Sequence, residues 1–189
     1  MRIVGGRFRG KRLTAPEGRD VRPTSDRVRE AVFNILAHGI DGGDPAGKTV
    51  LDLFCGTGAL GLEALSRGAA KVILVDADAA TVALARRNAG LVGAPRDVLT
   101  LRLDATRMPP PPRIAGAPVD LVFLDPPYGQ GLAGPSLLAL VRRGWIVAGA
   151  LAVVELGADE DFEPPAGFLV LDDRRYGAAR VVFLRHGAG

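Results

Sequence analysis

Four consecutive residues, Asp125-Pro126-Pro127-Tyr128, carry groups that suit chemistry on an aromatic amino group. The lone pair of an aryl amine is delocalised into its ring, so the amine needs acceptors that hold its protons while it attacks. Asp125 offers a carboxylate, and Pro126, which has no N–H and a fixed φ, offers its carbonyl. Pro127 stiffens the turn, and Tyr128 offers a face for base stacking worth about 1–3 kcal/mol. The tetrapeptide therefore indicates modification of the exocyclic amino group of a nucleic-acid base.

The position of the tetrapeptide in the fold strengthens this interpretation. It follows the apolar run Val119–Leu124, which predicts a buried strand. In open α/β sheets, ligands bind in the crevice outside the carboxyl ends of the strands. The alternative is an ordinary strand-ending turn, because Asp-Pro and Pro-Pro commonly end strands.

A glycine-rich loop, Gly56-Thr57-Gly58-Ala59-Leu60-Gly61, lies between a predicted strand at Thr49–Phe54 and a predicted helix at Ala59–Ser66. This is a G-x-G-x-x-G motif in the context that the motif requires. Its glycines permit a tight turn and close approach of a ligand to the backbone. Asp76 follows about 20 residues later, where a carboxylate can accept from ribose hydroxyls. The alternative is a tight strand-to-helix turn without a ligand.

Two further carboxylates favour S-adenosylmethionine over a nicotinamide dinucleotide as the ligand. Asp52 lies just before the loop, where it would repel a pyrophosphate but suits an ammonium and a sulfonium. Asp104 follows a predicted strand at Val98–Leu103 and can accept from an adenine amino group. The candidate cofactor-binding residues are Asp52, Gly56, Thr57, Gly58, Gly61, Asp76, Asp104 and Ala105. The implied reaction is in-line displacement at the sulfonium methyl, to which the enzyme contributes orientation and electrostatics.

Strands and helices alternate from Lys48 onwards, which predicts one α/β domain with a mostly parallel sheet covered on both faces. The further predicted elements are a strand at Lys71–Val75, a helix from the cap Asp78 to about Ala89, a helix at Leu137–Arg143, a strand at Leu151–Glu155, and a closing hairpin of Phe168–Leu171 and Val181–Leu184 around Gly177. An earlier helix, capped by Thr24 or Ser25, is predicted to reach Leu36.

Positive charge is concentrated at the amino terminus. The whole chain has a net charge of +3, whereas residues 1–30 hold nine basic and four acidic residues, a net charge of +5. This concentration of charge favours a polyanionic partner. The alternative is a solvated surface in an arginine-rich chain, which would have the same composition. We therefore predict a basic arm and helix at 1–40 that contact a polyanion, and a methyltransferase domain at 41–189.

Several classes of protein are disfavoured. The one cysteine, Cys55, excludes an internal disulfide and fits a reducing cytoplasm. The first residues lack the apolar stretch of a signal peptide, and no apolar run approaches the roughly 18–20 residues of a membrane span. His38 and His186 have no metal-binding spacing. We expect a cytoplasmic protein that contacts no membrane and uses no metal.

Longer runs resemble a known family. They are Arg2–Gly6 with Arg9-Gly10, Arg22–Glu30 with Phe33–Leu36, and Leu51–Ala69. These runs are similar to those of bacterial small-subunit (16S) ribosomal RNA (guanine-N(2))-methyltransferases, the RsmD family. The resemblance extends from Arg2 through Tyr128 and continues weakly to Gly177.

The resemblance implies a Rossmann-like class I methyltransferase with seven strands and a short basic extension. Its methyl donor would be S-adenosylmethionine, its product S-adenosylhomocysteine, and its substrate a guanine in an assembled or assembling small ribosomal subunit. We expect a monomer. The candidate RNA-binding residues are Arg7, Arg9, Lys11, Arg12, Arg22, Thr24, Arg27 and Arg29. The chain departs from the family at Cys55, Thr57 and Asp76, where alanine, serine and glutamate are common, and Tyr176–Ala179 matches poorly.

Different activities stay open. Guanine presents two neighbouring donors that one carboxylate can accept, so Asp125 favours guanine over adenine. An adenine amino methyltransferase acting on DNA or RNA is the alternative, although the chain lacks an obvious target-recognition domain for DNA. Two hypotheses from other classes of protein also stay open. One is a nicotinamide-dependent oxidoreductase, and the other is a non-catalytic RNA-binding module.

Overall fold

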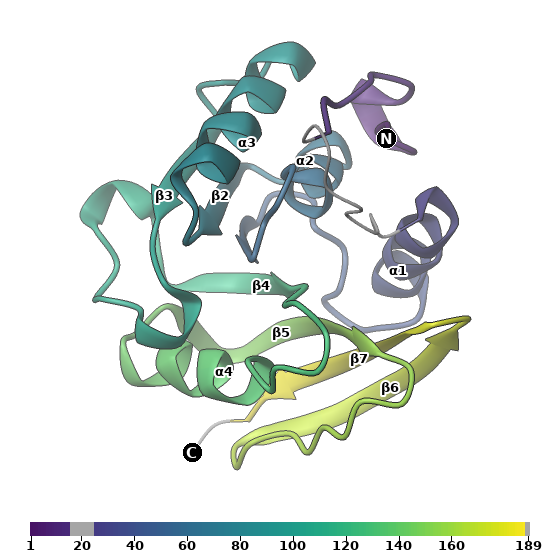
Figure 1. Ribbon diagram of the computed structural model, residues 1–189, viewed down its shortest axis with the longest axis vertical. Helices are drawn as coiled ribbons and strands as arrows, with labels where there is room; N and C mark the ends of the chain where they lie inside the picture. The colour runs from purple at the N-terminus through teal and green to yellow at the C-terminus, as the bar shows by residue number, and fades with distance from the viewer. Residues whose placement is uncertain (16–24, 188–189) are drawn as a thin grey trace.

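The computed structural model describes residues 1–15 and 25–187. A seven-stranded sheet in the order β3-β2-β1-β4-β5-β7-β6 forms its centre (Figure 1). The strands are β1 (Thr49–Leu53), β2 (Lys71–Asp76), β3 (Val98–Arg102), β4 (Val119–Leu124), β5 (Ile146–Gly157), β6 (Phe168–Tyr176) and β7 (Ala179–His186). Strands β1 to β5 are parallel, and β7 pairs antiparallel with both β5 and β6. The predicted mostly parallel sheet and its closing hairpin are confirmed.

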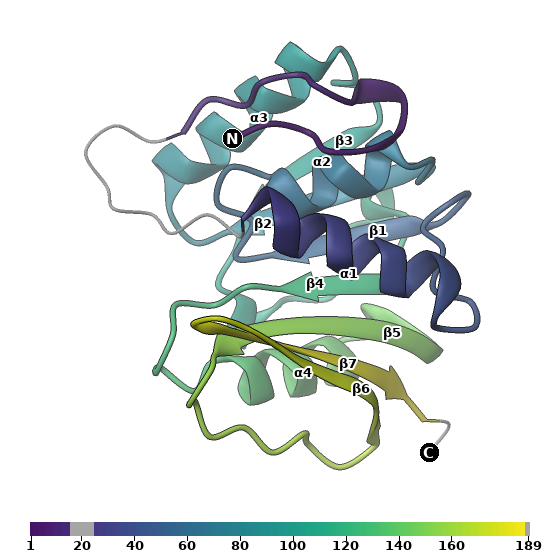
Figure 2. The same ribbon diagram turned by 90° about the vertical axis from the view of Figure 1, so that its right-hand side faces the viewer.

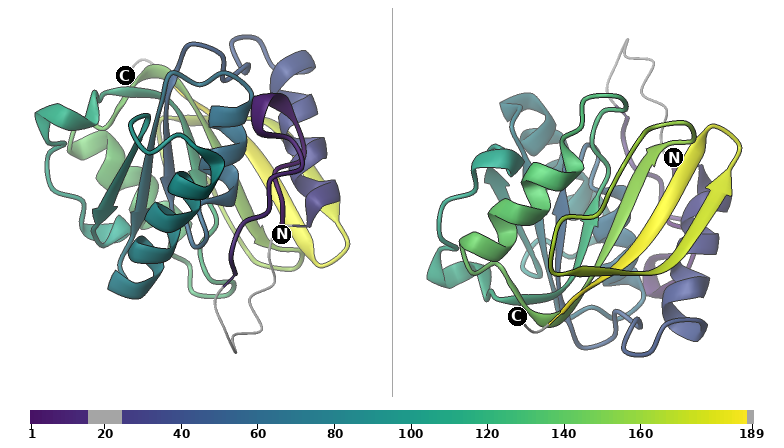
Figure 3. Two further views of the ribbon diagram at one scale, coloured as in Figure 1. Left: turned by 90° about the horizontal axis from the view of Figure 1, so that it is seen from above. Right: turned by 90° about the horizontal axis from the view of Figure 1, so that it is seen from below.

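Helices cover both faces of this sheet, as predicted (Figure 3). They are α1 (Asp26–His38), α2 (Ala59–Ser66), α3 (Ala79–Val92) and α4 (Ala133–Arg142), with short 3-10 turns η1 (Gly6–Phe8), η2 (Ala105–Arg107) and η3 (Arg113–Ala115). Ser25 caps α1 and Asp78 caps α3 through their side chains. Helix α4 begins before the predicted Leu137, because Gly134 and Pro135 lie in its first turn, where proline is tolerated. Among the described residues, no helix is long and apolar enough to cross a membrane.

Alternate residues of the central strands face opposite layers of the core. In β4, Leu121 and Phe123 pack with α1, α2 and α3, whereas Val122 and Leu124 pack with α4. The rings of Phe123 and Phe33 lie 5.4 Å apart, centroid to centroid. Because both faces are covered, β4 is apolar and buried from Leu121 to Leu124 instead of alternating with polar residues.

Residues 1–15, called the arm below, lie across α2 and α3 (Figure 2). An isolated bridge between Arg2 and Arg12 closes the arm into a loop that contains η1. Ile3 and Leu13 are buried in the same core cluster as Phe33 of α1. The arm and α1 are therefore packed into the main core, and a domain boundary at residue 40 stays a prediction.

Two helical glycines provide a matched test of packing between α2 and the sheet. A Cβ at Gly61 would lie 2.5 Å from Leu74 Cδ2 and 2.8 Å from Val72 Cγ1, whereas a Cβ at Gly90 in α3 would meet nothing within 4 Å. We expect Gly61→Ala to lower the free energy of unfolding by about 1–3 kcal/mol through overpacking. Gly90→Ala is expected to raise it by about 0.5–1 kcal/mol. Urea denaturation of both variants measures the free energy of unfolding. The same change in both variants would contradict the packing role of Gly61.

Candidate active site

A cavity of about 830 Å³ opens at the carboxyl ends of β1, β2, β3 and β4. Its wall contains most of the residues that the sequence singled out, namely Asp52, Gly56, Thr57, Asp76, Asp104, Ala105, Asp125, Pro126, Pro127 and Tyr128. Strand order reverses between β1 and β4, so the cavity lies where ligands bind in open α/β sheets. Residues from Asp52 to Tyr128, which come from four different strand ends, therefore share one site.

The loop between β1 and α2 is held in a conformation that few side chains tolerate. Phe54, Gly56 and Gly58 have φ angles of 58°, 54° and 80°. Phe54 is the one described residue other than glycine with a positive φ, and it lines the cavity. Such strain of about 1–3 kcal/mol persists where the surrounding structure enforces it, and it is common at ligand sites.

Two of the motif glycines, Gly58 and Gly61, are not among the cavity-lining residues. A Cβ at Gly58 would lie 2.9 Å from Leu74 Cδ1, and the Gly61 N–H donates to Asp52 Oδ2 at 2.8 Å. These glycines let α2 approach β1 and β2 closely and so position the loop. Direct contact between these two residues and a cofactor stays a prediction.

Asp52 is a buried carboxylate of the cavity with a strongly shifted pKa. Burial raises the pKa of Asp52 to about 7; the hydrogen bond from the Gly61 N–H opposes this rise, and the nearby Asp76 adds to it. A buried carboxylate with a pKa near neutrality is ready to be ionised by a cationic ligand.

The other two acidic residues expected to hold a ligand lie at strand ends. Asp76 accepts from the N–H groups of Gly56 at 3.2 Å and Asp78 at 3.0 Å. Asp104 uses Oδ1 to accept from the hydroxyl and the N–H of Thr106, and these bonds lower the pKa of Asp104. Both carboxylates are thereby fixed against the cavity wall.

The tetrapeptide follows β4 directly. The Asp125 N–H donates to Leu53 O at 3.5 Å, which places Asp125 beside the end of β1. Pro126 is buried, while Pro127 and Tyr128 are exposed. Asp125 and Tyr128 therefore line the cavity on the side opposite to the strand-end acids of β2 and β3.

Glu155 of β5 orients Tyr128 and was not predicted from the sequence. Its Oε1 accepts from the Tyr128 hydroxyl at 2.8 Å, and the Tyr128 ring lies 3.6 Å from the position of a Cβ at Gly157. The signal that could have found it is the acidic residue that ends the predicted strand Leu151–Glu155. Met1 and Phe54 also line the cavity without having been singled out.

Cys55 has no sign of reactivity. Its side chain is buried beside the loop, and burial raises the pKa of its thiol well above the usual value. Since the thiolate is the nucleophilic form, the structure supports a packing role for this residue.

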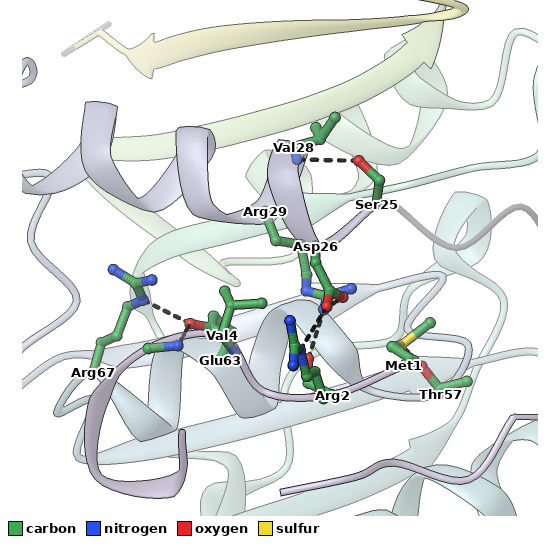
Figure 4. Close-up of polar contacts among 11 residues, drawn as sticks. Met1, Arg2, Val4, Ser25, Asp26, Val28, Arg29, Thr57, Glu63 and Arg67 are labelled. Atoms are coloured by element: carbon green, nitrogen blue, oxygen red, sulfur yellow. Dashed lines mark hydrogen bonds and ion pairs between the residues drawn. The ribbon is translucent and has the colours of Figure 1, made fainter. Parts of the chain in front are cut away.

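Most candidate RNA contacts that the structure describes are exposed: Arg7, Arg9, Lys11, Arg12 and Arg27. Arg22 and Thr24 lie outside the described residues. The prediction for Arg29 is wrong, because its side chain is fully buried and its guanidinium donates to Arg2 O and to Asp26 Oδ1, both at 2.7 Å (Figure 4). Arg29 ties the arm to α1.

Comparison with known proteins gives consistent matches over nearly the whole chain. The family model described as "Conserved hypothetical protein 95" matches residues 1–185. The Escherichia coli (strain K12) protein named "Ribosomal RNA small subunit methyltransferase D" is 38% identical over 160 residues, which cover 82% of this chain and 74% of that protein. A Haemophilus influenzae protein of the same name is 31% identical over 182 residues, covering 94% of this chain and 89% of its own length.

A solved structure shares the fold. The Escherichia coli protein described as "Putative methyltransferase yhhF" superposes with a TM-score of 0.82 at 32% identity, covering 100% of this chain and 99% of that one. The Rossmann-like fold and the resemblance inferred from the sequence are thereby confirmed. The chain belongs to the family described as Conserved hypothetical protein 95, the RsmD family.

Proposed function

We propose that this chain transfers a methyl group from S-adenosylmethionine to the exocyclic 2-amino group of a guanine in small-subunit ribosomal RNA. The observation that carries the proposal is the cavity shared by Asp52, Asp76 and Asp104 on one side and Asp125 and Tyr128 on the other. The names of the Escherichia coli and Haemophilus influenzae relatives support the same substrate.

The cavity fits S-adenosylmethionine in size and charge. Its volume of about 830 Å³ is within the usual range of small-molecule sites. Asp52 would face the ammonium group, Asp76 the ribose hydroxyls and Asp104 the adenine amino group. When bound, the cofactor supplies an electrophilic methyl group on sulfur.

The tetrapeptide supplies acceptors for the base. Asp125 and the Pro126 carbonyl would accept from the amino protons and hold the nitrogen lone pair out of the ring plane. Tyr128, held by Glu155, would stack on the base. Guanine is favoured over adenine because its two adjacent donors can both reach one carboxylate.

The exposed basic side chains of the arm and the start of α1 would contact ribosomal RNA. Phosphate contacts by arginine and lysine give affinity and register without reading sequence. We propose that the protein acts as a monomer, in the cytoplasm, on the small subunit or an assembly intermediate.

Transfer to small subunits tests the activity directly. We expect labelled S-adenosylmethionine and small subunits from a strain that lacks the activity to give labelled 2-methylguanosine in the RNA. Asp125→Ala is expected to lose transfer by at least about 100-fold while S-adenosylhomocysteine affinity changes little, because Asp125 acts on the base. Absence of 2-methylguanosine with the wild-type protein would refute the proposal, and full turnover by the variant would refute the role of Asp125.

The raised pKa of Asp52 predicts pH-dependent cofactor affinity. A cationic ligand binds the ionised carboxylate, whose fraction grows as the pH rises through about 7. We expect the affinity for S-adenosylhomocysteine to rise about tenfold between roughly pH 6 and 8. Isothermal titration calorimetry measures this, with Asp52→Asn as the control that should remove the dependence. The same slope in both proteins would show that another group titrates.

The Tyr128–Glu155 hydrogen bond predicts a graded series of variants. Tyr128→Phe keeps the ring but loses the hydroxyl, and we expect about a tenfold fall in kcat/KM for RNA, corresponding to about 1.4 kcal/mol. Glu155→Gln retains an acceptor, so its kcat/KM should stay near the wild-type value. Tyr128→Ala loses the ring as well, so its kcat/KM should be the lowest of the series. Steady-state kinetics would contradict a stacking role if Tyr128→Ala and Tyr128→Phe were equally active.

A further inference from the structure

Asn88 of α3 joins two segments that lie far from it in the sequence. Its side chain is fully buried. Its Oδ1 accepts from the Thr14 N–H at 2.9 Å, and its Nδ2 donates to Thr14 O at 3.1 Å and to Thr57 O at 2.8 Å. Thr14 lies near the end of the arm, and Thr57 is one of the glycine-loop residues that line the cavity. One side chain therefore connects the arm to the cavity wall.

The beginning of the arm contacts the same loop residue. The Thr57 hydroxyl donates to Met1 Sδ at 3.2 Å, and Met1 itself lines the cavity (Figure 4). Both ends of the arm thus meet Thr57, one through its hydroxyl and the other through its carbonyl and Asn88. These are called the loop contacts below.

The middle of the arm is held by α2 instead. Glu63 accepts from the N–H groups of Val4 and Gly5, each at 2.8 Å, and Ser66 Oγ accepts from the Phe8 N–H at 2.9 Å. Neither Glu63 nor Ser66 is among the residues that line the cavity. These α2 contacts hold the arm without touching the glycine loop, so they provide a natural control for the loop contacts.

The chemistry of an asparagine side chain fits its three partners. A primary amide offers one acceptor oxygen and two donor hydrogens, and Asn88 uses the oxygen for a backbone N–H and the nitrogen for two carbonyls. An aspartate of the same shape would still accept from Thr14 but would turn oxygen towards both carbonyls. Such a buried mismatch is unfavourable, because every polar group there needs a partner.

We propose that Asn88 is a positioning residue that couples occupancy of the cofactor cavity to docking of the arm. A ligand shifts such an equilibrium only if it contacts the two states differently. A cofactor that touches Thr57 and Met1 stabilises the docked arm, and Asn88 carries this effect to Thr14. Given the proposed function, the arm would present its basic residues to RNA most firmly when the cofactor is bound, and RNA would tighten cofactor binding by the same factor.

Amide hydrogen exchange of the wild-type chain, with and without saturating S-adenosylhomocysteine, tests the coupling. We expect the ligand to slow exchange of the arm amides Ile3, Leu13 and Thr14, whose N–H groups donate to Lys11 O, Met1 O and Asn88 Oδ1, at least threefold more than that of β7, which is remote from the cavity. An equal change in the arm and in β7 would overturn the proposal, since it would reflect global stabilisation only.

Two variants assign the effect to Asn88. Asn88→Asp and Ser66→Ala both remove hydrogen bonds of the arm, so both should speed its basal exchange. Ser66→Ala should keep the ligand-dependent slowing, whereas Asn88→Asp should lose it. Retained slowing in Asn88→Asp, or its loss in Ser66→Ala, would contradict the assignment. If circular dichroism shows that Asn88→Asp does not fold, Asn88→Ser replaces it, and the wild-type comparison still decides whether the ligand reaches the arm.

Calorimetry on the same wild-type sample separates this proposal from the proposed function. No binding of S-adenosylhomocysteine would refute the methyltransferase assignment itself. Binding without slower exchange in the arm would refute the coupling and leave the assignment intact.

Discussion

The close packing of α2 onto β1 and β2 at Gly61 is the constraint on which the rest of the site depends. With no side chain there, the helix approaches near enough for the Gly61 N–H to reach the Asp52 carboxylate at 2.8 Å. That bond holds a buried acid in the cavity wall and fixes the start of α2, and with it the strained loop that contains Phe54. The arm then docks on α2 through Glu63. Removing the close approach would disturb the loop, the acid and the arm together.

Much of the fold and the cavity wall could be predicted because the signals are local. Each central strand could be predicted from an apolar run that is followed by an acidic residue or by the tetrapeptide. Because the strands are parallel, their carboxyl ends meet at one edge of the sheet. Contacts between distant segments could not be predicted in this way, and Glu155, Met1 and Asn88 are examples. Arg29 was assigned to RNA together with the other basic residues of the segment that resembles the family, although its spacing from Val32, Phe33 and Leu36 places it on the buried side of α1.

The cavity joins two chemical environments that the proposed reaction needs side by side. The end formed by β1, β2 and β3 is acidic and suits a cationic cofactor, whereas the residues that follow β4 offer acceptors and an aromatic ring held by Glu155 of β5. Charge is also distributed unevenly along the sequence, because residues 1–30 have a net charge of +5 while the whole chain has a net charge of +3. The exposed basic side chains of the arm lie on a segment that also contacts Thr57 of the glycine-rich loop through Met1.

The proposed function depends first on a cavity that binds S-adenosylmethionine rather than a dinucleotide. Isothermal titration calorimetry of the wild-type chain with S-adenosylhomocysteine and, separately, with NADH tests it most directly. Asp52, buried at the loop, would repel a pyrophosphate but attract an ammonium. We expect saturable one-to-one binding of S-adenosylhomocysteine and no measurable binding of NADH. Binding of NADH without binding of S-adenosylhomocysteine would contradict it.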